Sequence, residues 1–124
     1  MSDFNPYMPV MGTVEKVVTE TPTIKTLTVR PERTIPFLAG QFMQFTVPGI
    51  GEAPFTPSSS PSKPELLDFT IIKTGTVTNH IHELTPGAQV GIRGPFGKGY
   101  PVGKAAGHDV LVVGGGCGLA PLRS

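Results

Sequence analysis

The stretch Phe42-Met43-Gln44-Phe45-Thr46-Val47 alternates between apolar and polar side chains, and this pattern decides the fold class. Met43, Phe45 and Val47 fall on one face, because successive side chains of a strand point to opposite faces. Similar β-type runs continue outward at 26–30, at 67–73, around Val90 and Ile92 and, less regularly, at 12–19. Turn-forming pairs separate them, namely Thr21-Pro22, Ala39-Gly40, Pro48-Gly49 and Pro86-Gly87. Short strands with this punctuation predict an antiparallel barrel or sandwich.

One segment departs from the period of two. Val77, Ile81 and Leu84 are spaced i, i+4 and i+7, which predicts a short amphipathic helix. Thr76 or Thr78 is the expected N-cap, and a glycine follows the end of the stripe at position 87. The sequence therefore predicts a loop at Gly75 that opens into a helix N-terminus.

The composition limits the classes of function open to this chain. Its 124 residues suffice for one domain with a core, and its 16 glycines and 14 prolines favour short strands with tight turns. A net charge of +1 argues against electrostatic binding to nucleic acid. No apolar run approaches the roughly 20 residues of a membrane span, and no signal peptide is recognisable. A single cysteine cannot form an internal disulfide, so we expect a cytoplasmic protein.

The segment from Val110 to Leu122 reads Val-Leu-Val-Val-Gly-Gly-Gly-Cys-Gly-Leu-Ala-Pro-Leu. An apolar run that enters a glycine-rich turn is typical of a strand and loop that hold a nucleotide pyrophosphate. Ser124 follows two residues later, whereas a βαβ unit takes about 30 residues or more. We therefore predict a barrel domain at 1–107 and the truncated start of a nucleotide-binding domain at 108–124.

Four motifs follow one another along nearly the whole chain. They are Ala53-Pro54-Phe55-Thr56-Pro57-Ser58-Ser59, Gly75-Thr76-Val77-Thr78, Gly94-Pro95-Phe96-Gly97 and the glycine-rich loop from Gly115 to Pro121. Together they resemble the motifs of the ferredoxin–NADP reductase superfamily. The resemblance implies a six-stranded antiparallel Greek-key barrel with one short helix. The truncated first strand of an α/β nucleotide-binding domain is expected to follow.

The resemblance also implies a flavin site, with FAD expected rather than FMN. Phe55 would pack on the flavin, and the hydroxyl of Thr56 would lie near flavin N5, which makes Thr56 the candidate catalytic residue. The turn from Gly75 to Thr78 would hold the pyrophosphate. The residues implied to bind FAD are Pro54, Phe55, Thr56, Pro57, Ser58, Ile71, Ile72, Lys73, Gly75, Thr76, Val77 and Thr78.

The second implied ligand is NAD or NADP in the intact protein. It would be held by Gly114, Gly115, Gly116, Cys117, Gly118, Leu119, Ala120 and Pro121. Cys117 is interpreted as a small residue in a tight loop rather than as a redox thiol. His80 and His82 lie two positions apart on the predicted helix and face different ways, so no metal site is predicted. Lys73, Arg93 and His108 are expected at the surface.

The stretches 5–10 and 48–54 look most like the gamma subunits of cytoplasmic hydrogenases and sulfur reductases. This branch implies an oxidoreductase that passes electrons between NAD(P)H, FAD and an iron–sulfur subunit or ferredoxin of a hydrogenase-type complex. The 124-residue chain alone is expected to be inactive toward NAD(P)H. Ala53 replaces the superfamily arginine that pairs with the flavin phosphate. The alternative is therefore a non-catalytic barrel that docks partner subunits without binding flavin.

Overall fold

A computed structural model describes residues 9–109, 111, 113 and 119–122, with the backbone alone at positions 102, 105, 119 and 120. The described chain contains six strands and a seven-residue helix, followed by two four-residue helices. The strands are β1 Val10–Thr21, β2 Ile24–Pro31, β3 Phe42–Val47, β4 Gly51–Phe55, β5 Leu67–Ile72 and β6 Gln89–Phe96. The helices are α1 Thr76–His82, α2 Val102–Ala105 and α3 Leu119–Leu122.

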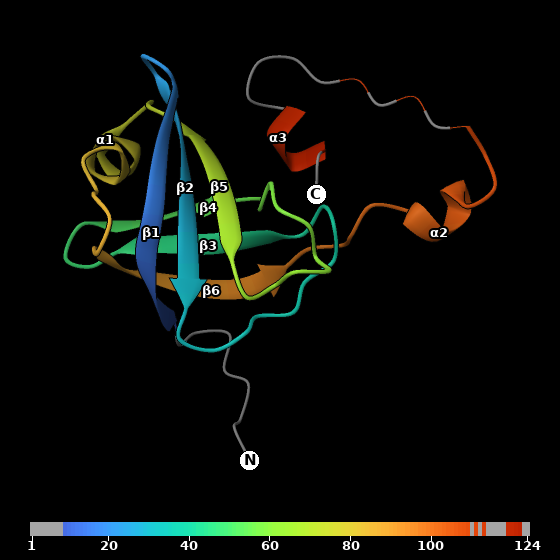
Figure 1. The fold of residues 1–124 in the computed structure, drawn as a ribbon, viewed down its shortest axis with the longest axis horizontal. Helices are drawn as coiled ribbons and strands as arrows, with labels where there is room; N and C mark the ends of the chain where they lie inside the picture. The colour runs from blue at the N-terminus through green and yellow to red at the C-terminus, as the bar shows by residue number, and fades with distance from the viewer. Residues whose placement is uncertain (1–8, 110, 112, 114–118, 123–124) are drawn as a thin grey trace.

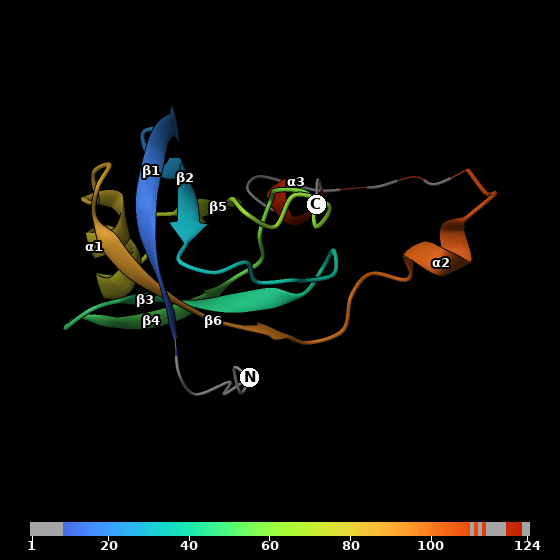
Figure 2. The same cartoon turned by 60° about the horizontal axis from the view of Figure 1, so that its bottom comes forward.

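The strands form one antiparallel sheet in the order β4-β3-β6-β1-β2-β5. Figure 1 shows β1, β2 and β5 running crosswise to β3, β4 and β6, and Figure 2 shows these two layers facing each other with α1 at one end. Strand β1 joins the layers, because it pairs with β2 in one and β6 in the other. The six-stranded barrel is therefore confirmed, although no backbone ladder joins the outer strands β4 and β5 in the part described.

The core fills the space between the layers. Strand β3 alternates between half-buried and buried residues, as its pattern predicts, and Met43, Phe45 and Val47 point inward. Phe45 is fully buried and makes edge-to-face contacts with Phe69 at 5.4 Å and Phe55 at 6.2 Å between ring centroids. Burial of one such aromatic ring contributes about 1.5–3 kcal/mol to folding. The three rings therefore connect β3, β5 and β4 at the centre of the barrel.

Strand β4 is too short and too poor in large apolar residues for its sequence to predict a strand. Its sequence, Gly51-Glu52-Ala53-Pro54-Phe55, contains a proline that cannot donate a ladder hydrogen bond. Pro54 is tolerated because β4 lies at the edge of the sheet, pairs only with β3, and exposes this residue. Ala53 and Phe55 lie on the opposite, partly buried face. Partial burial of one face shows in the structure that β4 is a strand, although its local sequence does not predict one.

The C-terminal segment differs from the expectation. The strand expected at Val110 to Val113 is not formed at the described positions 109, 111 and 113. Leu111 and Val113 are 89% and 80% exposed. A strand of a parallel sheet is buried by neighbours on both sides. None of the described strands pairs with Leu111 or Val113. The expected linker at 101–107 contains the short helix α2, so the one-helix expectation holds for the barrel only.

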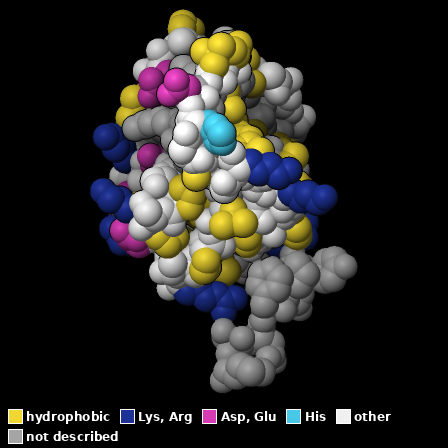
Figure 3. All heavy atoms as spheres, turned by 90° about the vertical axis from the view of Figure 1, so that its right-hand side faces the viewer, with side chains coloured by type: hydrophobic (Ala, Val, Ile, Leu, Met, Phe, Trp, Pro, Cys, Tyr) yellow, Lys and Arg dark blue, Asp and Glu magenta, His cyan; other side chains and the backbone are white. Residues whose placement is uncertain are grey.

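The surface on the side of the C-terminal segment is chemically mixed. Figure 3 shows hydrophobic side chains there interspersed with Lys, Arg and polar groups. His108 is exposed, as predicted. Within the described residues, none of the helices is long and apolar enough to cross a membrane.

Candidate functional site

The open seam between β4 and β5 brings three predicted segments together. Residue 58 follows β4 and bonds to β5, since its N–H donates to the carbonyl of Asp68 at 2.8 Å. Helix α1 packs against β4, where a side chain at Gly51 would meet Val77 at 3.3 Å. The same helix bonds to β5 through His82 and the carbonyl of Ile71. The loop after β4, the end of β5 and helix α1 are therefore all attached to the two outer strands of the sheet.

The loop after β4 divides its predicted residues into buried anchors and accessible groups. Ser58 is 2% exposed, and its hydroxyl lies 3.3 Å from both the Asp68 carbonyl and the Thr70 hydroxyl. Pro57 is fully buried beside it. Thr56 is partly exposed, and no described residue forms a hydrogen bond with its hydroxyl. Ser58 and Pro57 therefore hold the loop, whereas Thr56 has a hydroxyl to offer to a ligand.

Helix α1 begins with a turn built around one hydroxyl. The oxygen of Thr78 accepts the N–H groups of Thr74 and Gly75 at 2.8 Å each and donates to the Gly75 carbonyl at 3.1 Å. These three bonds use the full capacity of a hydroxyl. Gly75 is the N-cap, so the expectation of Thr76 or Thr78 at that position is wrong. The Thr78 hydroxyl is therefore fully used in shaping the turn.

The first turn of α1 offers backbone donors. The helix has no side-chain cap and no acidic residue in its first turn. The first N–H groups of a helix lack partners within the helix and carry the positive end of its dipole. Thr76, Val77 and Thr78 supply these groups at the seam. Such an arrangement binds phosphate oxygens.

Gly75 stands beside open space. Its φ of −168° is an extended conformation that any residue can adopt. A Cβ built at this position meets no atom within 4 Å. Gly75 is not among the glycines with a positive φ. Neither backbone conformation nor crowding by the protein requires glycine here, so the space above it is free for a ligand.

Two of the three predicted FAD-binding residues at the end of β5 are exposed. Ile71 is fully buried in the core, and its carbonyl is bonded to His82. Ile72 is 38% exposed, and Lys73 is exposed with its N–H bonded to the Thr23 carbonyl at 2.8 Å. Ile72 and Lys73 can therefore touch a ligand with their side chains, whereas Ile71 contributes through the core.

An ion pair that the sequence does not reveal crosses the neighbouring outer face. Arg93 on β6 bonds to the carboxylate of Glu52 on β4 and lies 5.5 Å above the Phe96 ring. Its side chain is 19% exposed, so Arg93 lies at the surface as expected, but it is partly covered and paired with Glu52. The Arg93 hydrogen bond holds the pKa of Glu52 below its ordinary value, a shift that partial burial opposes. These positions are 41 residues apart, and only the strand order joins them.

The predicted nucleotide residues lie mostly outside the described chain. Gly114, Gly115, Gly116, Cys117 and Gly118 are outside the described residues. Leu119, Ala120 and Pro121 belong to α3, where Pro121 is half-buried. Among the described residues, no group of three or more His, Cys, Asp and Glu side chains could hold a metal ion. The nucleotide site thus stays a prediction from sequence.

A family model for the oxidoreductase FAD-binding domain matches residues 10–100, which include all six strands and α1. This chain belongs to that family. The match covers the open seam, the loop after β4 and the turn before α1 in one domain. Residues 10–100 therefore form a domain of the oxidoreductase FAD-binding family, and the expected cofactor class is confirmed at the level of the family.

Two curated proteins illustrate the relationship. The sulfhydrogenase 1 subunit gamma of Pyrococcus furiosus is 47% identical over 88 residues, covering 71% of this chain and 30% of that protein. The phenol 2-monooxygenase reductase component DmpP of Pseudomonas sp. strain CF600 is 33% identical over 117 residues, covering 91% and 33%. The FAD-binding domain thus spans about a third of the length of these relatives. One is named as a subunit and the other as a reductase component.

Two solved structures share the fold of this chain. The Amycolatopsis cytochrome P450 reductase GcoB superposes with a TM-score of 0.81 at 25% identity, covering 92% of this chain and 36% of that one. The ferredoxin–NADP+ reductase of Plasmodium falciparum superposes with a TM-score of 0.66 at 16% identity, covering 75% and 40%. The second likeness shows the fold alone.

Proposed function

We propose that this domain binds FAD along the seam between β4, β5 and α1 and serves an NAD(P)H-dependent oxidoreductase. The observation that carries the proposal is the free space over Gly75 beside the uncapped N–H groups of α1, within a chain that belongs to an FAD-binding family. Bound FAD supplies the redox chemistry, accepting electron pairs and releasing single electrons. The protein supplies binding and orientation.

Each accessible group at the seam has a chemical role in this proposal. The N–H groups of Thr76, Val77 and Thr78 bind pyrophosphate oxygens, and the absence of a side chain at Gly75 allows their close approach. Phe55, which is held edge-on by Phe45, offers an apolar surface for the flavin. The Thr56 hydroxyl would donate a hydrogen bond to the flavin ring near N5. Backbone donors take the place of the missing arginine at position 53.

The proposed nicotinamide nucleotide site and electron acceptor are inferred from the sequence and from the relatives. We infer that NAD or NADP is held by Gly114 to Pro121 together with a complete second domain. Because the relatives are a subunit and a reductase component, the electron acceptor is proposed to be an iron–sulfur subunit or ferredoxin of a hydrogenase-type complex. A cytoplasmic location stays a prediction from the sequence.

Reconstitution with FAD tests the proposal directly. The purified chain is unfolded and refolded without flavin, then titrated with FAD while flavin fluorescence and visible absorbance are followed. We expect stoichiometric binding with a Kd of about 1 μM or lower, equivalent to about −8.2 kcal/mol. Thr56→Val keeps the side-chain shape and is expected to alter the visible spectrum of bound flavin more than the affinity. A folded protein that takes up no FAD would support the docking module instead.

A further inference from the structure

His82 is a buried histidine that the proposed function does not use. It is the last residue of α1, it is 7% exposed, and its Nε2 lies 2.7 Å from the Ile71 carbonyl oxygen. A carbonyl can only accept, so Nε2 carries the proton and donates. The carbonyl belongs to β5, an outer strand of the sheet. The imidazole therefore satisfies a polar group at the open edge of the barrel.

The main chain of the same residue is held by a second strand. The Lys25 ammonium on β2 donates to the His82 carbonyl at 2.8 Å. Lys25 and Ile71 are direct partners in the pairing of β2 with β5. A cation at a helix C-terminus also interacts favourably with the helix dipole. His82 thus fastens the end of α1 to two paired strands at a single register position.

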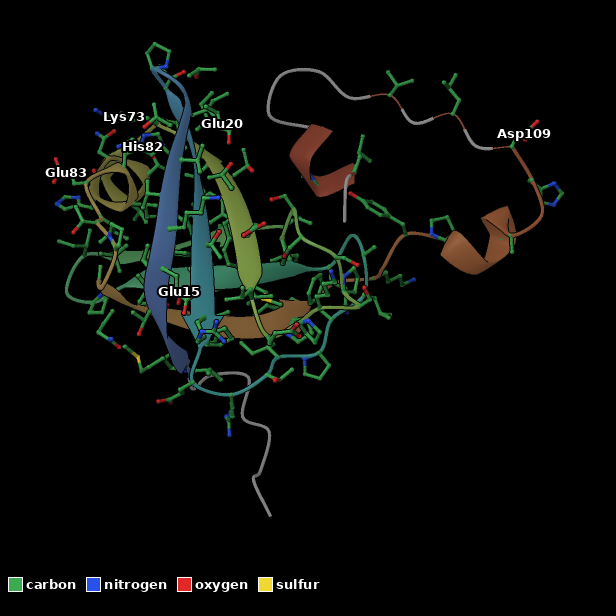
Figure 4. All side chains as sticks on the ribbon, viewed as in Figure 1. Glu15, Glu20, Lys73, His82, Glu83 and Asp109 are labelled. Carbon is green, nitrogen blue, oxygen red and sulfur yellow. The ribbon has the colours of Figure 1, made fainter. Side chains whose placement is uncertain are left out.

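This junction closes a loop around the flavin segment. The hydrogen bond from His82 to Ile71 encloses residues 72–81, which include the exposed Lys73, the open position at Gly75 and the N–H donors of α1. Inside the loop, Thr78 fixes Thr74 and Gly75. Figure 4 labels Lys73 and His82 near each other at α1. The end of α1 that is remote from its N–H donors is therefore also tied to β5.

We propose that His82 is a positioning residue for the phosphate-bearing part of FAD. It acts through α1 and touches no ligand itself. Loss of its Nε2–H frees the helix end from β5, so the N–H donors at the other end lose their alignment with the seam. The isoalloxazine contacts at Phe55 and Thr56 lie on β4 and its loop, outside the closed loop. The inference rests on the proposed function, because it assigns a role within that same site.

The test compares FAD with riboflavin, which lacks phosphate. His82→Phe fills the space without a donor, and His82→Gln restores an N–H donor. His80→Gln is the matched control, because His80 is half-buried on α1 and its imidazole bonds to the Thr76 carbonyl of the same helix. We expect His82→Phe to weaken FAD binding about tenfold and riboflavin binding less than about threefold, with His82→Gln close to wild type. Circular dichroism checks that each variant is folded.

Lys25→Met provides a second variant that keeps the histidine and removes the other half of the junction. Lys16→Met on β1 is its control for lost charge. We expect the first to weaken FAD binding several-fold more than the second, with little change for riboflavin. Unchanged FAD affinity in both His82→Phe and Lys25→Met, or an equal loss for FAD and riboflavin, would overturn the positioning role. If wild type itself binds no FAD, the proposed function fails, which is a separate result.

Discussion

Replacing Gly75 with alanine is expected to weaken FAD binding without weakening the fold. The backbone at Gly75 has an extended φ of −168°, and the new methyl group meets no protein atom within 4 Å. Alanine restricts the unfolded chain more than glycine does. Where the native conformation suits alanine, this substitution stabilises a protein by about 0.4–1 kcal/mol. The free energy of unfolding should therefore stay equal or rise slightly.

The substitution is expected to lower the affinity for FAD. The methyl group occupies the free space that the proposed pyrophosphate needs to reach the N–H groups of Thr76 to Thr78. Loss of one hydrogen bond to a charged phosphate costs about 1.5–3 kcal/mol. That range corresponds to roughly a 10- to 150-fold increase in the Kd for FAD. Riboflavin affinity should change little, because riboflavin has no phosphate.

Two titrations and one unfolding curve decide the matter. FAD and riboflavin binding are measured by flavin fluorescence, and unfolding by urea is followed by circular dichroism. Gly103→Ala is the matched control, since this position on α2 also has no atom within 4 Å of a new Cβ and no positive φ. If Gly75→Ala binds FAD as tightly as wild type and is equally stable, the pyrophosphate does not lie over Gly75. In that case the placement of the cofactor is wrong.

Three further outcomes are expected. Ala53→Arg should tighten FAD binding roughly 10- to 150-fold relative to Ala53→Met, less so at high salt, and calorimetry that shows no gain would mean that the phosphate is neutralised elsewhere. Phe45→Ala should lower the free energy of unfolding by about 3–5 kcal/mol in urea, because Phe45 is fully buried between two rings, and a loss below about 1 kcal/mol would contradict that packing. Because Arg93 lowers the pKa of Glu52, the pair stabilises the fold above the ordinary carboxyl pKa, and this is lost as pH falls through the lowered value. Glu52→Gln should therefore lower the free energy of unfolding by about 0–1 kcal/mol at neutral pH and by progressively less in acid. A difference in the free energy of unfolding between variant and wild type that does not change with pH would argue against the pair.

The barrel could be predicted from local sequence because its strands expose one face to the core. The alternation at 42–47 predicts β3 with its observed bounds, and the apolar residues of 67–73 predict β5 to within one residue. The stripe of Val77, Ile81 and Leu84 predicts α1 and the side that packs on the core. These patterns encode burial, which is the main force that forms the elements.

Features that depend on strand order could not be read locally. Glu52 and Arg93 meet because β3 lies between β4 and β6, and His82 reaches Ile71 because β5 is an outer strand of the sheet. The short sequence of strand β4 does not predict a strand, and the pairing with β3 forms it. The run at 110–113 shows the reverse case, since a strongly apolar pattern predicts a strand whose described residues have no partner.

The chemistry of the site explains why its residue pattern is hard to recognise. The predicted side chains Ser58 and Thr78 are bonded within the protein, and Ile71 is buried in the core. The groups left for phosphate are backbone N–H donors and the empty space at Gly75. Backbone donors do not depend on residue type, so a barrel with Ala53 in place of arginine can keep a phosphate site. In the proposed site, the residue whose type matters most at this turn is Gly75, because a side chain there would fill the space proposed for the pyrophosphate.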